Sequence, residues 1–155
     1  MTGPVQEYLV DTNILLRASR EEDREHEIVA SALLFLEAQR TPLYYSLQNV
    51  AEFWNVCTRP DDRNGYGLSA FETNRRVKSI ERRMTFLPDS DRVYSIWRQL
   101  VVAYGVRGVQ VHDARLAAIM TAYGVTHILT LNQPDFLRYS NIQVVHPNQV
   151  QLSPR

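Results

Sequence analysis

The fold is decided by YLVDTNILL, residues 8–16, because a strand-like segment changes there into a second apolar run. Residues 5–10 form a short β-prone segment that ends at Asp11. In open α/β sheets, ligands bind at the carboxyl ends of strands, where loops lead into helices. Asp11 is therefore a candidate for chemistry. The alternative is that Asp11 only begins the next helix, since Asp is a favoured N-cap residue.

Length and composition favour one globular domain. The 155 residues, 45% hydrophobic and 22% charged, suffice for one core. We expect a single domain over residues 1–155, with a loose tail after residue 147. No apolar stretch has the length of a membrane span, and residues 1–4 lack the features of a signal peptide, so we expect a cytoplasmic protein. Cys57 is the only cysteine, which excludes an internal disulfide and a thiolate metal cluster.

The charges give little indication of a partner. Seventeen basic and seventeen acidic side chains cancel, so net charge does not point to nucleic acid. Lys78 is the only lysine and the other basic residues are arginine. Arginine suits bidentate phosphate contacts, but the bias is equally explained by genome composition.

Strand-like and helix-like spacing alternate along the chain. We expect further strands at residues 43–46, 84–87, 126–131 and 142–145. Helices are expected at residues 26–40, at residues 47–58, from residue 69, from residues 88–91 to Gly105, and from residues 112–113 to Gly124. This alternation predicts an α/β fold, with a mostly parallel sheet of four or five strands and helices on both faces.

Asp113 is the second carboxylate of interest. At helical spacing, Ala117 and Met120 lie on its side of the helix. An acid beside an apolar face is costly unless it is paired, protonated or bound to a cation. N-capping of the helix is the alternative role.

Glu52 lies in the expected helix at residues 47–58, away from the arc of apolar side chains that we expect to face the core, which begins with Leu47. By default it is a solvated surface glutamate. Its polar stripe with Gln48 and Asn55 has a second interpretation, as the lining of a cleft.

Asp135 follows the expected strand at residues 126–131 by a few positions. Its alternative role is turn formation, since Pro-Asp pairs are common in turns. Asn132 is closer to the strand end and would supply an amide oxygen without a charge.

Three acids, Asp11, Asp113 and Asp135, are thus expected at strand ends or strand-to-helix junctions. In a parallel sheet such points gather along one edge. Carboxylates in one pocket repel one another, and divalent cations that prefer oxygen relieve the repulsion. Mg²⁺ or Mn²⁺ is the natural candidate, since no paired histidines or cysteines suggest zinc.

Four motifs occur in order along the chain: VDTN at residues 10–13, NVAEF at 49–53, HDARLA at 112–117 and LTLNQPDF at 129–136. In this order and spacing, the chain resembles a PIN-domain protein of the VapC toxin type, from residue 8 to about residue 145. The resemblance implies an α/β/α sandwich that cleaves RNA with Mg²⁺ or Mn²⁺. It also implies a homodimer and a small antitoxin protein as partner.

Carried over by this resemblance, the family's acidic quartet falls on Asp11, Glu52, Asp113 and Asp135. Thr12 or Asn13 would support the first acid by hydrogen bonding. One departure is Asn132, where many relatives carry an aspartate. The fourth position is therefore open between Asn132 and Asp135.

The hypothesis is hydrolysis of an RNA phosphodiester by a metal-activated water. Asp11 and Asp113 are assigned as principal ligands, while Glu52 and Asp135 complete the shell or orient the water. Basic residues are expected to steer the substrate, unless they are simply a solvated helix face. The candidates are Arg75, Lys78 and Arg82 on one helix stripe, with Arg17 or Arg59 nearer the cleft.

Two rival functions stay open. A phosphatase would use Asp11 as a covalent nucleophile, but such enzymes usually have a second acid two residues on, where this chain has Asn13. A non-catalytic module would bind RNA or protein through the same fold. Mg²⁺-dependent cleavage of RNA separates the enzyme from the binder.

Overall fold

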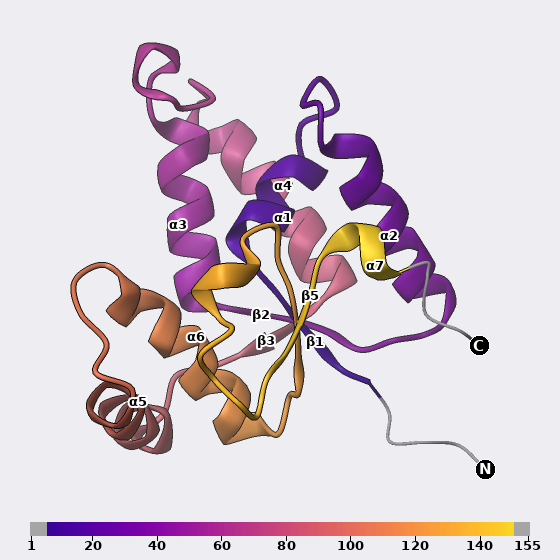
Figure 1. Cartoon of the computed structure of the whole chain (residues 1–155). Helices are drawn as coiled ribbons and strands as arrows, with labels where there is room; N and C mark the ends of the chain where they lie inside the picture. Colours follow the sequence, from indigo (N-terminus) through magenta and orange to yellow (C-terminus); the bar gives the residue numbers. More distant parts are fainter. Residues whose placement is uncertain (1–5, 151–155) are drawn as a thin grey trace.

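The computed structural model describes residues 6–150, and its centre is a five-stranded sheet with the order β3-β2-β1-β4-β5 (Figure 1). Every neighbouring pair of strands is parallel. The strands are β1 (Tyr8–Val10), β2 (Leu43–Ser46), β3 (Thr85–Leu87), β4 (His127–Leu129) and β5 (Gln143–Val145). The predicted parallel α/β sheet is confirmed.

Helices cover both faces of the sheet, as predicted (Figure 1). On one face lie α1 (Thr12–Ala18), α2 (His26–Ala38), α3 (Leu47–Thr58), α4 (Ala70–Arg83) and α7 (Pro147–Val150). On the other lie α5 (Asp91–Ala103) and α6 (Gln110–Tyr123). Two short 3₁₀ turns, η1 (Asp61–Arg63) and η2 (Gln133–Asp135), follow α3 and β4.

Strand β1 lies in the middle of the sheet and contributes to both halves of the core. Tyr8 and Val10 pack among the helices of one face, while Leu9 packs among those of the other. This is the twofold alternation of a strand. All three residues are buried, which explains why the strand reads as a continuous apolar run.

The strand order reverses beside β1. The chain places β2 and β3 on one side of β1, then returns to place β4 and β5 on the other. The topological switch point therefore lies between β1 and β4, and in open α/β sheets this is where ligands bind. Asp11 follows β1 at this point, and its backbone N–H donates to Leu129 O over 3.0 Å.

The apolar arc expected to carry Leu47 is wrong at the start of α3. Leu47 is 55% exposed, while Gln48 and Asn49 are buried. The cause is a capping box in which the Ser46 side chain accepts from Asn49 N and the Asn49 side chain accepts from Ser46 N. Polar side chains can be buried when hydrogen bonds satisfy them, so the first turn of α3 presents polar groups to the sheet edge.

The tail expected to be loose after residue 147 is ordered over its first residues. Pro147–Val150 forms α7, whose Pro147 and Val150 are buried and which packs against α2. The burial of these two apolar side chains explains the order. Residues 151–155 lie outside the described residues. Within residues 6–150, no helix has the length and apolar character needed to cross a membrane.

Candidate active site

Asp11 stands at the carboxyl end of β1, and its two oxygens have different partners. Oδ1 accepts from the backbone N–H of Thr12 over 2.8 Å, so Asp11 is the N-cap of α1. Oδ2 accepts from the hydroxyl of Thr130 over 2.7 Å and from Asn13 Nδ2 over 3.3 Å. The helix-cap role is therefore real, and it uses only one of the two oxygens. Both expected supports, Thr12 and Asn13, bond to Asp11.

The Asp11 carboxylate is buried without a cation beside it. The side chain forms no ion pair with any residue in the described range 6–150. Burial raises the pKa of Asp11 from 3.8 to about 6, hydrogen bonds from Thr130 and Thr12 lower it, and the negative charges of Glu52 and Asp135 raise it. Such a shifted acid in a ligand-binding position is typical of a functional site.

Thr130 is a site residue that the sequence analysis did not find. It is fully buried and follows β4, and its hydroxyl also accepts from Asn132 N over 3.0 Å. Only the strand register of the structure reveals it: parallel pairing of β1 with β4 places Val10 beside Leu129, so the next residues, Asp11 and Thr130, fall side by side.

Glu52 is not the solvated surface residue that its position on α3 suggests. It is half-buried, and Oε2 accepts from the Thr12 hydroxyl over 2.9 Å while Oε1 accepts from Gln48 Nε2 over 2.9 Å. The Thr12 hydroxyl accepts in turn from Asn49 Nδ2 over 3.2 Å. Glu52 is thus tied to the residue next to Asp11. Gln48 and Glu52 of the polar stripe bond within the protein, whereas Asn55 is exposed.

Gln48 links α3 to α6 and is a second residue that the sequence analysis underrated. Its Nε2 donates to Glu52 and also to His112 O over 2.8 Å, directly before Asp113. Its Oε1 is buried and has no hydrogen-bond partner among residues 6–150. A buried acceptor without a donor calls for a further group at this place, such as a water or a cation.

Asp113 lies inside the first turn of α6, so the N-cap role considered for it is wrong. The N-cap is Val109, which makes no side-chain bond. The expectation of a strand-to-helix junction is also wrong here, because the preceding element is α5 and α6 begins at Gln110. Asp113 is half-buried and is carried to the sheet edge by the helix itself.

The charges of the other acids reach Asp113. Burial, then the negative charges of Asp135, Asp11 and Glu52, raise the pKa of Asp113 from 3.8 to about 7. The positive charge of Arg138 lowers it. The structure therefore brings all four predicted acids into one electrostatically coupled group. We call this group, Asp11, Glu52, Asp113 and Asp135, the acidic site.

Asp135 belongs to η2, and Asn132 holds it there. The amide Nδ2 of Asn132 donates to Asp135 Oδ2. Asn132 is exposed, whereas Asp135 is half-buried and its charge raises the pKa of both Asp11 and Asp113. Of the two candidates for the fourth position, Asp135 contributes charge to the acidic site and Asn132 orients it.

The donor chemistry of the acidic site suits a hard divalent cation. Its donors are all oxygen atoms, which fits Mg²⁺ or Mn²⁺ and not zinc. The unpartnered Gln48 Oε1 adds one more oxygen beside Glu52. Among residues 6–150, however, no three His, Cys, Asp or Glu side chains already stand in the arrangement of a metal cluster. The fit is therefore one of chemistry and charge.

None of the basic residues expected to steer a substrate is among the charges that shift the pKa of Asp11 or Asp113. Arg17 is paired with Asp23 at 3.5 Å, and Arg59 donates to Asn64 O over 2.9 Å. The helix stripe is on the exposed face of α4, as in the solvation alternative, and consists of Arg75, Lys78 and Arg82. The positive charge that acts on Asp113 is that of Arg138.

Comparison with known proteins finds a matching family model and several solved structures with a similar fold. The family model described as the PIN domain matches residues 8–141. Among curated proteins, none matches the chain. Solved structures match the chain at 16–20% identity, and similarity at this level shows the fold alone.

Three solved structures are similar over most of their own length. VapBC2 from Rickettsia felis, bound to a DNA fragment from its promoter, has a TM-score of 0.67 at 16% identity, covering 91% of this chain and 98% of that one. A toxin-antitoxin complex from Klebsiella pneumoniae has a TM-score of 0.63 at 20% identity, covering 91% and 98%. Mycobacterium tuberculosis VapC20, a sarcin-ricin loop cleaving toxin, has a TM-score of 0.65 at 16% identity, covering 86% and 95%.

Proposed function

The chain belongs to the PIN-domain family, and from this we propose that it is an endoribonuclease that hydrolyses RNA phosphodiester bonds with Mg²⁺ or Mn²⁺. The observation that carries the proposal is the acidic site itself. Asp11 and Asp113, from distant parts of the chain, both sense the negative charges of Glu52 and Asp135, and Asp11 lies at the switch point of the parallel sheet. None of the four forms an ion pair within residues 6–150.

The four acids have different parts in this proposal. Asp11 and Asp113 hold the ion, because the pKa of each is raised in its absence and each therefore gains most from a cation. Glu52 and Asp135 complete the shell or orient the attacking water. The divalent ion, when bound, supplies an acidified water and stabilises negative charge on the phosphate.

The protein residues around the acids hold them in place. Thr130 and Asn13 fix Oδ2 of Asp11, and Thr12 fixes Glu52. Gln48 holds Glu52 at a set distance from the first turn of α6. In known metal sites, removal of a residue that orients a ligand lowers metal affinity or activity by about 10–100-fold.

We also propose that the protein acts as the toxin of a toxin-antitoxin pair. Its structural relatives include the Klebsiella pneumoniae toxin-antitoxin complex and the Mycobacterium tuberculosis toxin that cleaves the sarcin-ricin loop. The proposed partner is a small antitoxin protein. The proposed assembly is a homodimer that acts on RNA in the cytoplasm.

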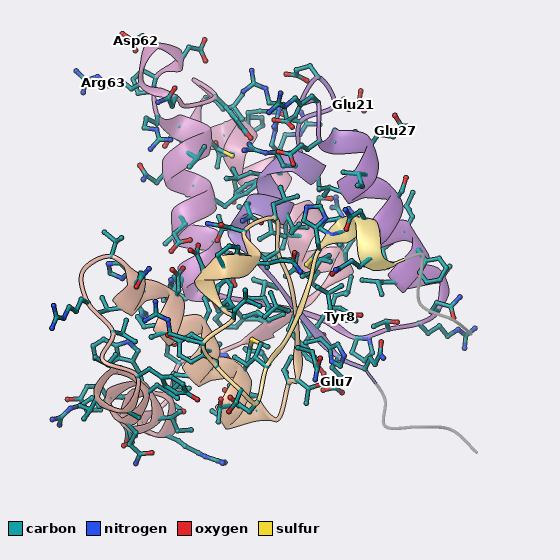
Figure 2. All side chains as sticks on the ribbon, in the orientation of Figure 1. Glu7, Tyr8, Glu21, Glu27, Asp62 and Arg63 are labelled. Carbon is teal, nitrogen blue, oxygen red and sulfur yellow. The ribbon has the colours of Figure 1, made fainter. Side chains whose placement is uncertain are left out.

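The test is cleavage of RNA by purified protein, followed on a denaturing gel. Wild type should cut only with Mg²⁺ or Mn²⁺, and both Asp11→Asn and Asp113→Asn should lose cutting. Asn keeps the helix cap at position 11. Asp62→Asn is a matched control, since Figure 2 shows Asp62 at the outer end of the loop after α3. If both site variants cut RNA as well as the Asp62→Asn control does, the proposed mechanism is wrong.

The same preparation separates the rival functions. A non-catalytic module would bind RNA and leave it intact with every ion. A phosphatase would form a trappable phosphate ester on Asp11, but the position two residues on is Asn13, whose side chain is already bonded to Asp11 Oδ2 and to Leu131 N. The structure thus offers no second acid for that chemistry at Asn13.

A further inference from the structure

Arg138 lies between the segments that carry two of the acids. It follows Asp135 by three residues, in the loop after η2, and is half-buried. Its Nη2 donates to Gln110 Oε1 over 2.6 Å. Gln110 is the first residue of α6 and precedes Asp113 by three positions, about one helical turn. The guanidinium therefore links the segment that carries Asp135 to the first turn of α6, which carries Asp113.

The charge of Arg138 is not neutralised by a neighbouring carboxylate. Within residues 6–150 it takes part in no ion pair, in contrast to six other arginines of the chain. Those six are Arg17, Arg20, Arg75, Arg76, Arg83 and Arg115.

The reach of this charge is seen in two side chains. Burial raises the pKa of Asp113 and of Tyr139, and Arg138 lowers both. Tyr139 is only 1% exposed and also senses the charge of Asp113. Arg138 and Asp113 thus lie near the same buried ring.

A guanidinium has five N–H donors in a planar fork. Of these, only the bond to Gln110 is used among residues 6–150. The rest of the fork has the geometry that suits two oxygens of one phosphate. A site built of carboxylates repels a polyanion such as RNA, so a cation at its edge is needed to hold the backbone there.

We propose that Arg138 binds a backbone phosphate of the RNA substrate at the edge of the acidic site. This inference rests on the proposed function and names the residue that holds the substrate beside the acids. Arg138 takes the steering role expected of the exposed stripe on α4, because it bonds to the first turn of the helix that carries Asp113.

A different role, in which Arg138 only holds the site's structure through its bond to Gln110, predicts a different effect on cation binding. If Arg138 binds phosphate, its removal weakens RNA binding, while the affinity for Mn²⁺ stays the same or increases because a positive charge is lost beside the acids. If Arg138 only stabilises the site's structure, both affinities fall together.

The experiment measures binding of a fluorescent single-stranded oligoribonucleotide by anisotropy, in a Glu52→Gln background that the proposed function expects to be unable to cut. Arg138→Gln should weaken binding about tenfold and Arg138→Lys less, since Lys keeps the charge but not the fork. The slope of log affinity against log salt should fall by roughly 0.7 for the lost contact. Arg82→Gln, on the exposed face of α4, is the matched control and should bind as the background does.

Mn²⁺ affinity of Arg138→Gln is measured alongside, without RNA. Equal RNA affinity of Arg138→Gln and Arg82→Gln would overturn the inference, as would a parallel loss of RNA and Mn²⁺ affinity. Cleavage by the otherwise unaltered protein is scored separately. If the wild-type protein binds RNA through Arg138 but does not cut it, the proposed function is wrong and the inference about Arg138 stands.

Discussion

The hydroxyl of Thr130 donates to Oδ2 of Asp11 over 2.7 Å, and this bond joins the ends of β4 and β1 across the switch point of the sheet. A hydrogen bond to the charged form of an acid lowers its pKa. It opposes the burial that raises the pKa of Asp11 to about 6. Thr130 therefore keeps Asp11 available in its charged form near neutral pH.

Replacing this hydroxyl should cost both stability and activity. Thr130→Val keeps the shape but leaves the charged Oδ2 with one donor fewer, so the free energy of unfolding should fall by about 1–3 kcal/mol. The acid limb of the pH–cleavage profile should move to higher pH. Thr58→Val is the control, because that hydroxyl donates to Trp54 O within its own helix. Urea unfolding and pH profiles that match those of the control would contradict this account.

Without a divalent ion, the protein should become less stable as pH rises. In the folded state the pKa of Asp11 is about 6 and that of Asp113 about 7, both raised from 3.8. The folded protein therefore retains protons that the unfolded chain releases. This stability is fully present below about pH 4 and is lost as pH rises to about 7. For Asp11 the shift corresponds to about 3 kcal/mol.

The measurement is urea unfolding in EDTA across this pH range. The double variant Asp11→Asn, Asp113→Asn should lose most of the pH dependence, since neither amide titrates. A double variant as pH-dependent as wild type would show that other groups carry the effect.

Divalent ions should reverse that pH trend. Mn²⁺ binds the deprotonated acids, so binding releases protons and strengthens as pH rises. The melting temperature should increase with Mn²⁺, and by more at pH 8 than at pH 6, roughly in step with proton release. Calorimetry in two buffers of different ionisation enthalpy counts the protons. A melting temperature that Mn²⁺ leaves unchanged at both pH values would argue against a metal at these acids.

Gln48 should matter although it forms no hydrogen bond to Asp11 within residues 6–150. Gln48→Met has similar volume but no donor, so Glu52 Oε1 and His112 O each lose a hydrogen bond. These two lost bonds should lower the free energy of unfolding by about 1–2 kcal/mol, and the loss is limited because the buried Oε1 without a partner is removed as well. RNA cleavage should fall by about tenfold. Asn55→Ala, exposed on the same helix, is the control and should change neither quantity.

The fourth acid can be assigned by one pair of variants. Asp135→Asn removes a charge from the acidic site and should lower kcat/KM by more than about 100-fold, whereas Asn132→Ala removes only the donor that orients Asp135 and should lower it by about tenfold. Both are measured with the same fluorescent RNA. The reverse order of effects would make Asn132 the residue that acts and Asp135 its support.

Local sequence signals predicted much of the fold. The strand at residues 43–46 and the helix at residues 47–58 were predicted with the bounds that β2 and α3 have. Pro42 and Pro60 explain this, because proline limits where a helix can run. The position of β1 followed from an apolar run that ends in a polar residue.

The partners of the acids could not be predicted locally. Thr130 lies 119 residues from Asp11, and the carbonyl of His112 lies 64 residues from Gln48. Burial of Gln48 is decided by the arrival of α6, and no property of its own helix indicates it. Asp11 and Asp135 were found because charged residues near strand ends are a local signal, Asp113 because an acid lay beside an apolar helix face, and Glu52 through the family resemblance. Neutral residues that bond to these acids give no such signal.

The helix cap made by Asp11 has a practical consequence for anyone who needs a dead enzyme for partner capture or crystallisation. Position 11 caps a helix as well as carrying charge, so most replacements there will damage folding and catalysis at once. Asp113 begins no helix. Silencing the protein through Asp113→Asn therefore leaves the scaffold intact and gives the cleaner reagent.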